Sequence, residues 1–165
     1  MTPLWETTRD LHHACEQHPV GAAMASGQPP MEWYSKWVMA LYQIHAVLDN
    51  HLPSEVHRTE RLASDLVKTN AYTTQLVSAA NYAESLTDEK RIAGASYVLT
   101  GAHLMGGEVM RRRLEGYPTK HLEWDDRKAA LAVLQTFRTR EDISQEARDC
   151  FSALLAVMDE IKTSQ

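Results

Sequence analysis

The chain has 165 residues, of which 44% are hydrophobic and 24% are charged. This length fits one globular domain with a buried core, and the composition argues against a disordered, collagen-like or coiled-coil protein. Seventeen Lys and Arg against 22 Asp and Glu give a net charge of −5, the wrong sign for broad binding of nucleic acid.

The cellular location is predicted from the apolar runs, the first residues and the cysteines. No apolar run is long enough to span a membrane, and the first residues lack the basic and apolar regions of a secretory signal. The two cysteines, Cys15 and Cys150, are too few and too far apart for a zinc motif or a disulfide framework. We therefore expect a soluble cytoplasmic protein with reduced thiols and no membrane partner.

The spacing of apolar residues predicts an all-α, single-domain helical bundle over residues 1–165, with about seven helices. Apolar residues recur three or four positions apart, whereas the period-two alternation of strands is nearly absent. The first helix should begin at Thr2 and Pro3 and end before Pro19, and residues 21–30 should form a loop of small residues. A second helix over residues 31–51 should bury the apolar stripe of Trp33, Trp37, Leu41, Ile44 and Leu48.

Five further helices are expected over residues 54–68, 72–86, 87–114, 128–138 and 144–162. Ser54 can cap the first of these, and Thr87 with Asp88 begins the longest. Gly116 and Pro118 should end that long helix.

One histidine lies in a setting that suits a metal ligand. His12 is followed one helical turn later by Glu16, so the carboxylate can accept the Nδ1 proton while Nε2 stays free. A second-shell acceptor of this kind fixes the tautomer of a metal-bound imidazole. An ordinary surface pair of His and Glu is the alternative. His13 has Gln17 one turn later and points about 100° away from His12.

Three glycines interrupt the long predicted helix at positions 101, 106 and 107. Each glycine inside a helix costs about 1 kcal/mol relative to alanine, so something should offset the loss. Close approach of the backbone to a flat ligand is one explanation, and close packing of two helices is the other.

The remaining polar residues could bind a ligand or could be ordinary solvated side chains. His45 lies near the tryptophan stripe, whereas we expect solvated side chains at His18, His51, His57 and His121. Arginines in two groups can anchor an anionic ligand or form solvated faces: Arg111, Arg112 and Arg113, then Arg138 and Arg140. The Glu-x-x-His, His-Glu-x-x-His, P-loop and Gly-x-Gly-x-x-Gly patterns are all missing from the sequence.

Two stretches of the sequence resemble haem oxygenases. Residues 11–16 (Leu-His-His-Ala-Cys-Glu), Gly27 and residues 37–48 resemble the N-terminal region of that family. Tyr97, followed nine residues later by Gly106 and Gly107, resembles its glycine-rich distal helix. The resemblance runs in order along most of the chain, although the stretches between the motifs and after Leu114 match only as helices.

The resemblance implies a haem oxygenase-like fold and an oxidoreductase that opens haem b to biliverdin, with release of carbon monoxide and iron. Haem would be both substrate and cofactor, O₂ the oxidant, and the electron donor a ferredoxin, a flavodoxin or a reductase.

Site residues are carried over from the family position by position. His12 would be the proximal ligand of the haem iron, with Glu16 as its hydrogen-bonding partner. Ala102, Gly106 and Gly107 would approach the macrocycle closely. Arg9 and Arg138, with Arg140 as an alternative to the second, would lie near the propionates.

The sequence departs from the family pattern at three positions. The usual acidic organiser of distal water aligns with His103, a tyrosine aligns with His45, and an arginine aligns with Leu99. His103 and His45 are therefore expected, with Gly106, to form the catalytic face, since histidine can hydrogen-bond water and relay protons. Direct ligation of iron by His103 is the alternative, and it would make the protein a haem carrier or sensor.

Two other classes of protein also fit the sequence. A thiaminase-like helical hydrolase would use Cys15 or Cys150 as its nucleophile, although neither has a recognisable base nearby in the sequence. A module that only binds other proteins is the third reading.

Overall fold

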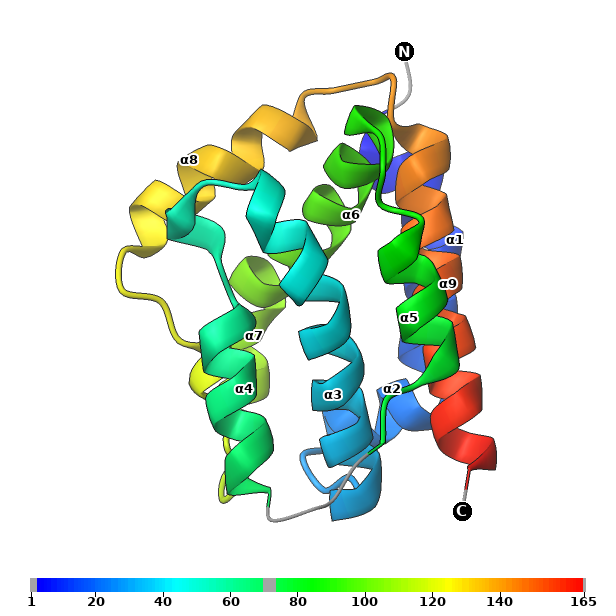
Figure 1. The fold of residues 1–165 in the computed structure, drawn as a ribbon, viewed down its shortest axis with the longest axis vertical. Helices are drawn as coiled ribbons and strands as arrows, with labels where there is room; N and C mark the ends of the chain where they lie inside the picture. Colours follow the sequence, from blue (N-terminus) through cyan, green and yellow to red (C-terminus); the bar gives the residue numbers. More distant parts are fainter. Residues whose placement is uncertain (1–2, 70–73, 165) are drawn as a thin grey trace.

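The computed structural model describes residues 3–69 and 74–164, and within these ranges the chain is helical with no strand (Figure 1). The prediction of an all-α fold is therefore confirmed. The α-helices of the described ranges are α1 (Leu4–Gln17), α2 (Pro19–Ser26), α3 (Met31–Leu48), α4 (Thr59–Lys68), α5 (Val77–Glu84), α6 (Glu89–Gly101), α7 (Gly107–Arg113), α8 (Arg127–Arg138) and α9 (Ser144–Thr163).

The loop predicted over residues 21–30 is wrong, because α2 occupies most of it. Pro19 stands at the first position of this helix, where its fixed φ is favourable, and does not merely end α1. The Nδ1 atom of His18 accepts a hydrogen bond from the Val20 backbone N–H at 3.1 Å and caps the helix start. Gly27 ends the helix with φ +80°, a left-handed conformation that favours glycine.

Other helix boundaries differ from the prediction in smaller ways. The third and fourth predicted helices begin later than expected, since Ser54–Val56 is a separate 3₁₀ turn and α5 starts at Val77. The second predicted helix likewise ends in a 3₁₀ turn, Asp49–His51. Two predicted starting residues, Thr2 and Tyr72, lie outside the described residues.

The long predicted helix over residues 87–114 is divided in three by a π-helical segment. Asp88 caps its start, where the carboxylate accepts a hydrogen bond from the Arg91 backbone N–H at 2.9 Å. After α6, residues Ala102–Gly106 form the π segment, and α7 follows directly. Single π turns inside α-helices are frequent at functional sites.

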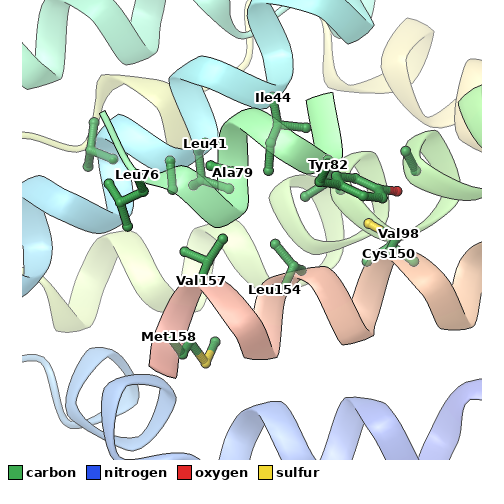
Figure 2. Packing of buried hydrophobic residues seen from close by; sticks show 14 of the residues in the cluster. Leu41, Ile44, Leu76, Ala79, Tyr82, Val98, Cys150, Leu154, Val157 and Met158 are labelled. Atoms are coloured by element: carbon green, nitrogen blue, oxygen red, sulfur yellow. The ribbon is translucent and has the colours of Figure 1, made fainter. Parts of the chain in front are cut away.

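The main core lies between α3, α5, α6 and α9. Figure 2 shows the side chains that meet there: Leu41 and Ile44 from α3, Ala79 and Tyr82 from α5, Val98 from α6, and Cys150, Leu154 and Val157 from α9. The predicted stripe of α3 is confirmed, because Leu41, Ile44 and Leu48 are buried and Trp33 and Trp37 pack partly against the same core. None of the described helices is both long and apolar enough to cross a membrane.

The closest approach of α6 to α9 depends on Gly94. A Cβ atom at this position would lie 2.6 Å from the backbone carbonyl carbon of Glu146, so α9 leaves no room for a side chain. Gly106, by contrast, has no atom within 4 Å of the place where its Cβ would be. The two glycines therefore serve different purposes.

We predict that Gly94→Ala lowers the free energy of unfolding by about 1–3 kcal/mol, because α6 and α9 must move apart to admit the methyl group. The matched variant Gly106→Ala should leave stability unchanged or raise it by up to about 1 kcal/mol, since alanine is the better helix former. Urea unfolding followed by circular dichroism measures both. Equal losses in the two variants would contradict the assignment of Gly94 to packing.

Candidate functional site

The N-terminal ends of α1 and α6 meet around Ile143. Leu4 of α1 and Ala93 of α6 share a small buried cluster with Ile143. One turn farther along both helices, burial raises the pKa of Tyr97, and Thr8 lies close enough to oppose part of that shift. The two helices therefore come close to each other at two successive turns.

The same two faces are uncovered farther along the helices. His12 follows Thr8 by four residues and so continues the face of α1 that lies near Tyr97 one turn earlier, and the exposed Ala102 follows Tyr97 by five. Here the His12 side chain is 61% exposed, and Met105 and Val109 are 51% and 48% exposed. We call these positions together the open face: His12, Glu16, Ala102, Met105 and Val109 are exposed, and Gly106 is half-buried.

The open face is bounded at its far end by a second contact, between α2 and α7. A Cβ atom on Gly27 would overlap the backbone carbonyl of Arg113, so the two helices touch there. The Arg113 guanidinium also donates a hydrogen bond to the Ala25 carbonyl at 3.3 Å. The chain forms two arms here, α1 with α2 and α6 with α7. The exposed positions lie between the place where α1 approaches α6 and the place where α2 contacts α7.

His12 and Glu16 form the pair that their spacing predicted. Nδ1 of His12 lies 3.2 Å from Oε1 of Glu16, and the ring stands edge-on to Phe151 with the centroids 5.9 Å apart. Both side chains are well exposed, and an exposed ion pair contributes little to stability. The carboxylate holds the imidazole so that Nε2 is free to bind a ligand.

The glycine cluster is explained only in part by packing within the chain. A Cβ on Gly107 would make ordinary contact with Leu122 at 3.6 Å, and one on Gly101 would reach a single methyl group of Leu134 at 3.9 Å. At Gly106 nothing lies within 4 Å. Helix packing therefore does not account for Gly106, and the space beside it fits a group that presses against the backbone.

Side chains from the segment after α7 hold the π segment from behind. Trp124 Nε1 donates to the His103 carbonyl at 3.3 Å, and an Arg127 Nη donates to the Leu104 carbonyl at 3.2 Å. The Arg58 guanidinium stacks on the Trp124 ring at 3.6 Å and donates to the His121 carbonyl. These contacts satisfy carbonyl groups that the altered helical pattern leaves available.

Three buried histidines lie together behind the π segment, and we call them the histidine cluster: His45 of α3, His103 of the π segment and His121 of the 3₁₀ turn Lys120–Leu122. The ring of His103 is 5.2 Å from that of His45 and 5.7 Å from that of His121, both in edge-to-face geometry. The expectation of a solvated His121 is wrong, since this residue is 3% exposed.

Two buried carboxylates hold the outer members of the cluster. Asp49 lies 3.0 Å from His45 Nδ1 and also accepts hydrogen bonds from the Arg58 and Thr59 backbones. Burial alone would raise the pKa of Asp49, but hydrogen bonds and charge from His45, with hydrogen bonds from Thr59, lower it to about 2. Asp65 lies 2.6 Å from His121 Nδ1, and His121 similarly lowers its pKa despite burial.

His103 is neutral, with its proton on Nδ1. Burial, together with the nearby charges of His45 and His121, holds its pKa well below the usual value. Its Nδ1 lies 2.8 Å from the Leu99 carbonyl, which can only accept a hydrogen bond. The ring is packed among the other two histidines, on the side of the π segment away from the exposed Ala102 and Met105. In this position it does not support the alternative of a second axial iron ligand.

The predicted basic residues differ in their availability. Arg9 is exposed and stacks over Trp5 at 5.6 Å, and Arg138 is exposed and close enough to lower the pKa of Tyr97 against the larger effect of burial. Arg140 is paired with both Glu89 and Asp142. Since its guanidinium is already engaged, the structure gives no support to Arg140 as the alternative anchor.

Neither cysteine suits a nucleophile. Burial, with a smaller effect from Glu16, raises the pKa of the Cys15 thiol to about 11. Burial likewise raises the pKa of Cys150 to about 12. Both thiols are therefore protonated at neutral pH, whereas the thiolate is the reactive form. The structure thus gives no support to the hydrolase reading.

Several site residues were missed by the sequence analysis. Asp49 stands four residues after His45, the same spacing that singled out His12 and Glu16, and this signal was available. Asp65 and His121 are 56 positions apart, and Trp124 meets the π segment across 21 positions, so no local pattern relates these partners.

Comparison with solved structures identifies the architecture. Heme oxygenase from Leptospira interrogans matches with a TM-score of 0.81 over 95% of this chain and 97% of its own, at 19% identity. The chain has the haem oxygenase fold. Heme oxygenase-1 from Synechocystis, solved in complex with heme, matches with a TM-score of 0.82 over 96% of this chain and 90% of its own, at 18% identity.

A second Synechocystis structure, heme oxygenase-2 in complex with heme and NO, matches with a TM-score of 0.77 at 21% identity, over 96% of this chain and 83% of its own. No protein-family model and no curated protein sequence matches the chain. The likeness therefore lies in the fold, and the chemistry must be argued from the residues of this chain.

Asp49 should make the stability of the fold depend on acid pH. A folded-state pKa of about 2, below the usual value of 3.8, stabilises the fold above about pH 4, and this contribution is lost as the pH falls through about 2. Asp49→Asn should cost about 2 kcal/mol at pH 7, and the difference from wild type should shrink between about pH 4 and 2.

Urea unfolding at a series of pH values tests this dependence. The matched control is Asp125→Asn, because Asp125 is exposed and its ion pair with Arg61 is open to solvent. A difference between wild type and Asp49→Asn that stays constant down to pH 2 would contradict the prediction.

Proposed function

We propose that the protein is a haem oxygenase, which binds haem b on the open face and cleaves it to biliverdin, carbon monoxide and iron. The observation that carries this proposal is the open face itself. It combines an exposed imidazole oriented by a carboxylate with a π segment in which Gly106 has open space beside its backbone. Haem-bound structures among the similar folds support the same choice of ligand.

The residues of the open face fit this flat ligand. His12 would bind the iron through Nε2 while Glu16 holds the Nδ1 proton, which keeps the imidazole in the tautomer that a metal requires. Ala102 and Gly106 are small enough for the backbone to approach the macrocycle closely, and Met105 and Val109 supply apolar contact. When bound, haem would supply both the iron at which O₂ is reduced and the ring that is opened.

The distal segment would restrict where oxygen can react. A backbone that pressed on one face of the macrocycle would leave free space over that face in only some directions, so this segment would direct the site of cleavage. Arg9 and Arg138, both exposed, would pair with the propionates. His103, on the buried side of the segment, and His45, which packs against it, would hold or transfer protons there.

Electrons must come from outside the chain. A ferredoxin, a flavodoxin or a reductase is the proposed donor, and the cytoplasm is the proposed location.

Hemin titration tests the proposal directly. The wild-type protein should bind one hemin per chain with a sharp Soret band, and a reductant with O₂ should convert the complex to biliverdin and carbon monoxide. A complex that forms but stays intact under reductant and O₂ would overturn the oxygenase proposal and leave haem binding alone.

His12→Ala should weaken hemin binding at least tenfold and remove the spectral signature of an axial imidazole. The matched control His13→Ala should keep the wild-type spectrum, because its side chain points about 100° away around the helix. Absorbance and electron paramagnetic resonance spectra of the two complexes decide the outcome. An unchanged ligand field in His12→Ala would exclude His12 as the ligand.

Gly106→Leu should separate ligand binding from folding. Since no atom lies within 4 Å of the Cβ position, the protein without haem should unfold at nearly the wild-type urea concentration. The added side chain would occupy the space proposed for the macrocycle, so hemin affinity should fall at least tenfold. Wild-type affinity in this variant would place haem elsewhere.

A further inference from the structure

Two side chains that follow α7 in the sequence donate hydrogen bonds to consecutive carbonyl groups of the π segment. Nε1 of Trp124 donates to the His103 carbonyl at 3.3 Å, and an Nη atom of Arg127 donates to the Leu104 carbonyl at 3.2 Å. A regular α-helix would pair each of these carbonyls with the N–H group four residues later along the chain. Donors from outside the helix therefore favour the π pattern over the α pattern at this place.

The face of the Trp124 ring is covered by the Arg58 guanidinium, whose central carbon lies 3.6 Å from the ring centroid. The same guanidinium donates to the His121 carbonyl at 3.1 Å and to the Glu123 carbonyl at 2.6 Å. Arg58 is only 4% exposed, and its backbone N–H donates to the Asp49 carboxylate at 2.8 Å. The indole is therefore held by a buried side chain that is itself fixed by several partners.

The 3₁₀ turn that precedes Trp124 is anchored independently, by Asp65 of α4. The Asp65 carboxylate accepts hydrogen bonds from the Lys120 backbone N–H at 2.9 Å and from the His121 backbone N–H at 2.7 Å. This turn is thereby tied to α4. The place of Trp124 is set by α4 and Arg58, so its N–H group is a fixed point against which the π segment is held.

The other side of the π segment has no such restraint. Among the described residues, no atom lies within 4 Å of the place where a Cβ on Gly106 would be, and Ala102 and Met105 are exposed. The backbone is therefore restrained from its buried side, by the packing of Leu104 and by the two hydrogen bonds to its carbonyls. Loss of those hydrogen bonds would let the segment shift toward or away from the open face.

We infer that Trp124 and Arg127 are positioning residues that determine where the macrocycle is cleaved. The inference rests on the proposed function, in which the π segment covers part of the haem. By fixing two carbonyls of this segment, the two side chains would keep one edge of the macrocycle accessible and the other edges covered. Neither side chain belongs to the open face, so they would act through the backbone of His103 and Leu104.

Hydrogen exchange of the haem-free protein tests the anchoring. Trp124→Phe keeps an aromatic ring beneath Arg58 but removes the N–H donor, and Arg127→Met removes the second donor at an exposed position. In each variant the amide protons of residues 102–108 should exchange about fivefold faster than in wild type, whereas those of α9 should keep their rates. Unchanged rates in residues 102–108, or equal acceleration in both regions, would overturn the inference.

The distribution of biliverdin isomers, measured by chromatography, tests the specificity. The wild type should form mainly one isomer, and the double variant Trp124→Phe/Arg127→Met should lower the ratio of that isomer to the others about tenfold. Hemin affinity and the spectral signature of the axial imidazole should stay as in wild type, because His12 is unaltered. The matched control Arg112→Met removes a guanidinium that is 75% exposed on α7 and should keep the wild-type isomer ratio.

The outcomes separate this inference from the proposed function. A wild-type isomer ratio in the double variant, or a mixture of isomers from the wild type itself, would overturn the inference and leave the oxygenase activity standing. Failure of the wild type to form any biliverdin would refute the proposed function and, with it, the role in specificity. Local acceleration of exchange in the haem-free variants would still establish the anchoring in that case.

Discussion

The separation of α1 from α6 beyond the contact of Thr8 with Tyr97 is the constraint on which the rest of the site depends. Up to that turn the two helices come close to each other, and beyond it His12, Ala102 and Met105 are exposed. The second contact, between Gly27 and Arg113, holds α2 against α7 and so limits how far the two pairs of helices separate. The stretch between the two contacts is left uncovered, and helical periodicity determines which residues are exposed there.

The two sides of the π segment have different surroundings. Toward α1 it offers small and apolar groups with space beside Gly106, whereas its buried side meets imidazoles, carboxylates and a guanidinium. Its three nearby glycines sacrifice about 3 kcal/mol of helix propensity. Hydrogen bonds from Trp124 and Arg127 to its carbonyls, each worth roughly 1 kcal/mol, offset part of that cost and fix the altered backbone.

Much of the architecture was predictable from local pattern, and much of the site was not. The helices other than α2 follow from apolar spacing, and the contact of His12 with Glu16 follows from a spacing of four. Pro19 was misread because proline both ends one helix and begins the next. His121 was placed in solvent because its partner Asp65 lies on α4, and a partner so distant in sequence leaves no local signature. The sequence shows three glycines where the π segment lies, but it does not predict the π geometry. Only the three-dimensional structure distinguishes the packing role of Gly94 from the open space at Gly106.

Gly27 also determines how closely α2 approaches α7. Its left-handed backbone and its missing side chain allow α2 to rest directly on the last turn of α7. Because Gly27 has no side chain, the backbones of α2 and α7 come very close together there. Any larger residue at this position would push the two helices apart. In the proposed complex, the space available to the haem would therefore be set partly by a glycine that need never touch it.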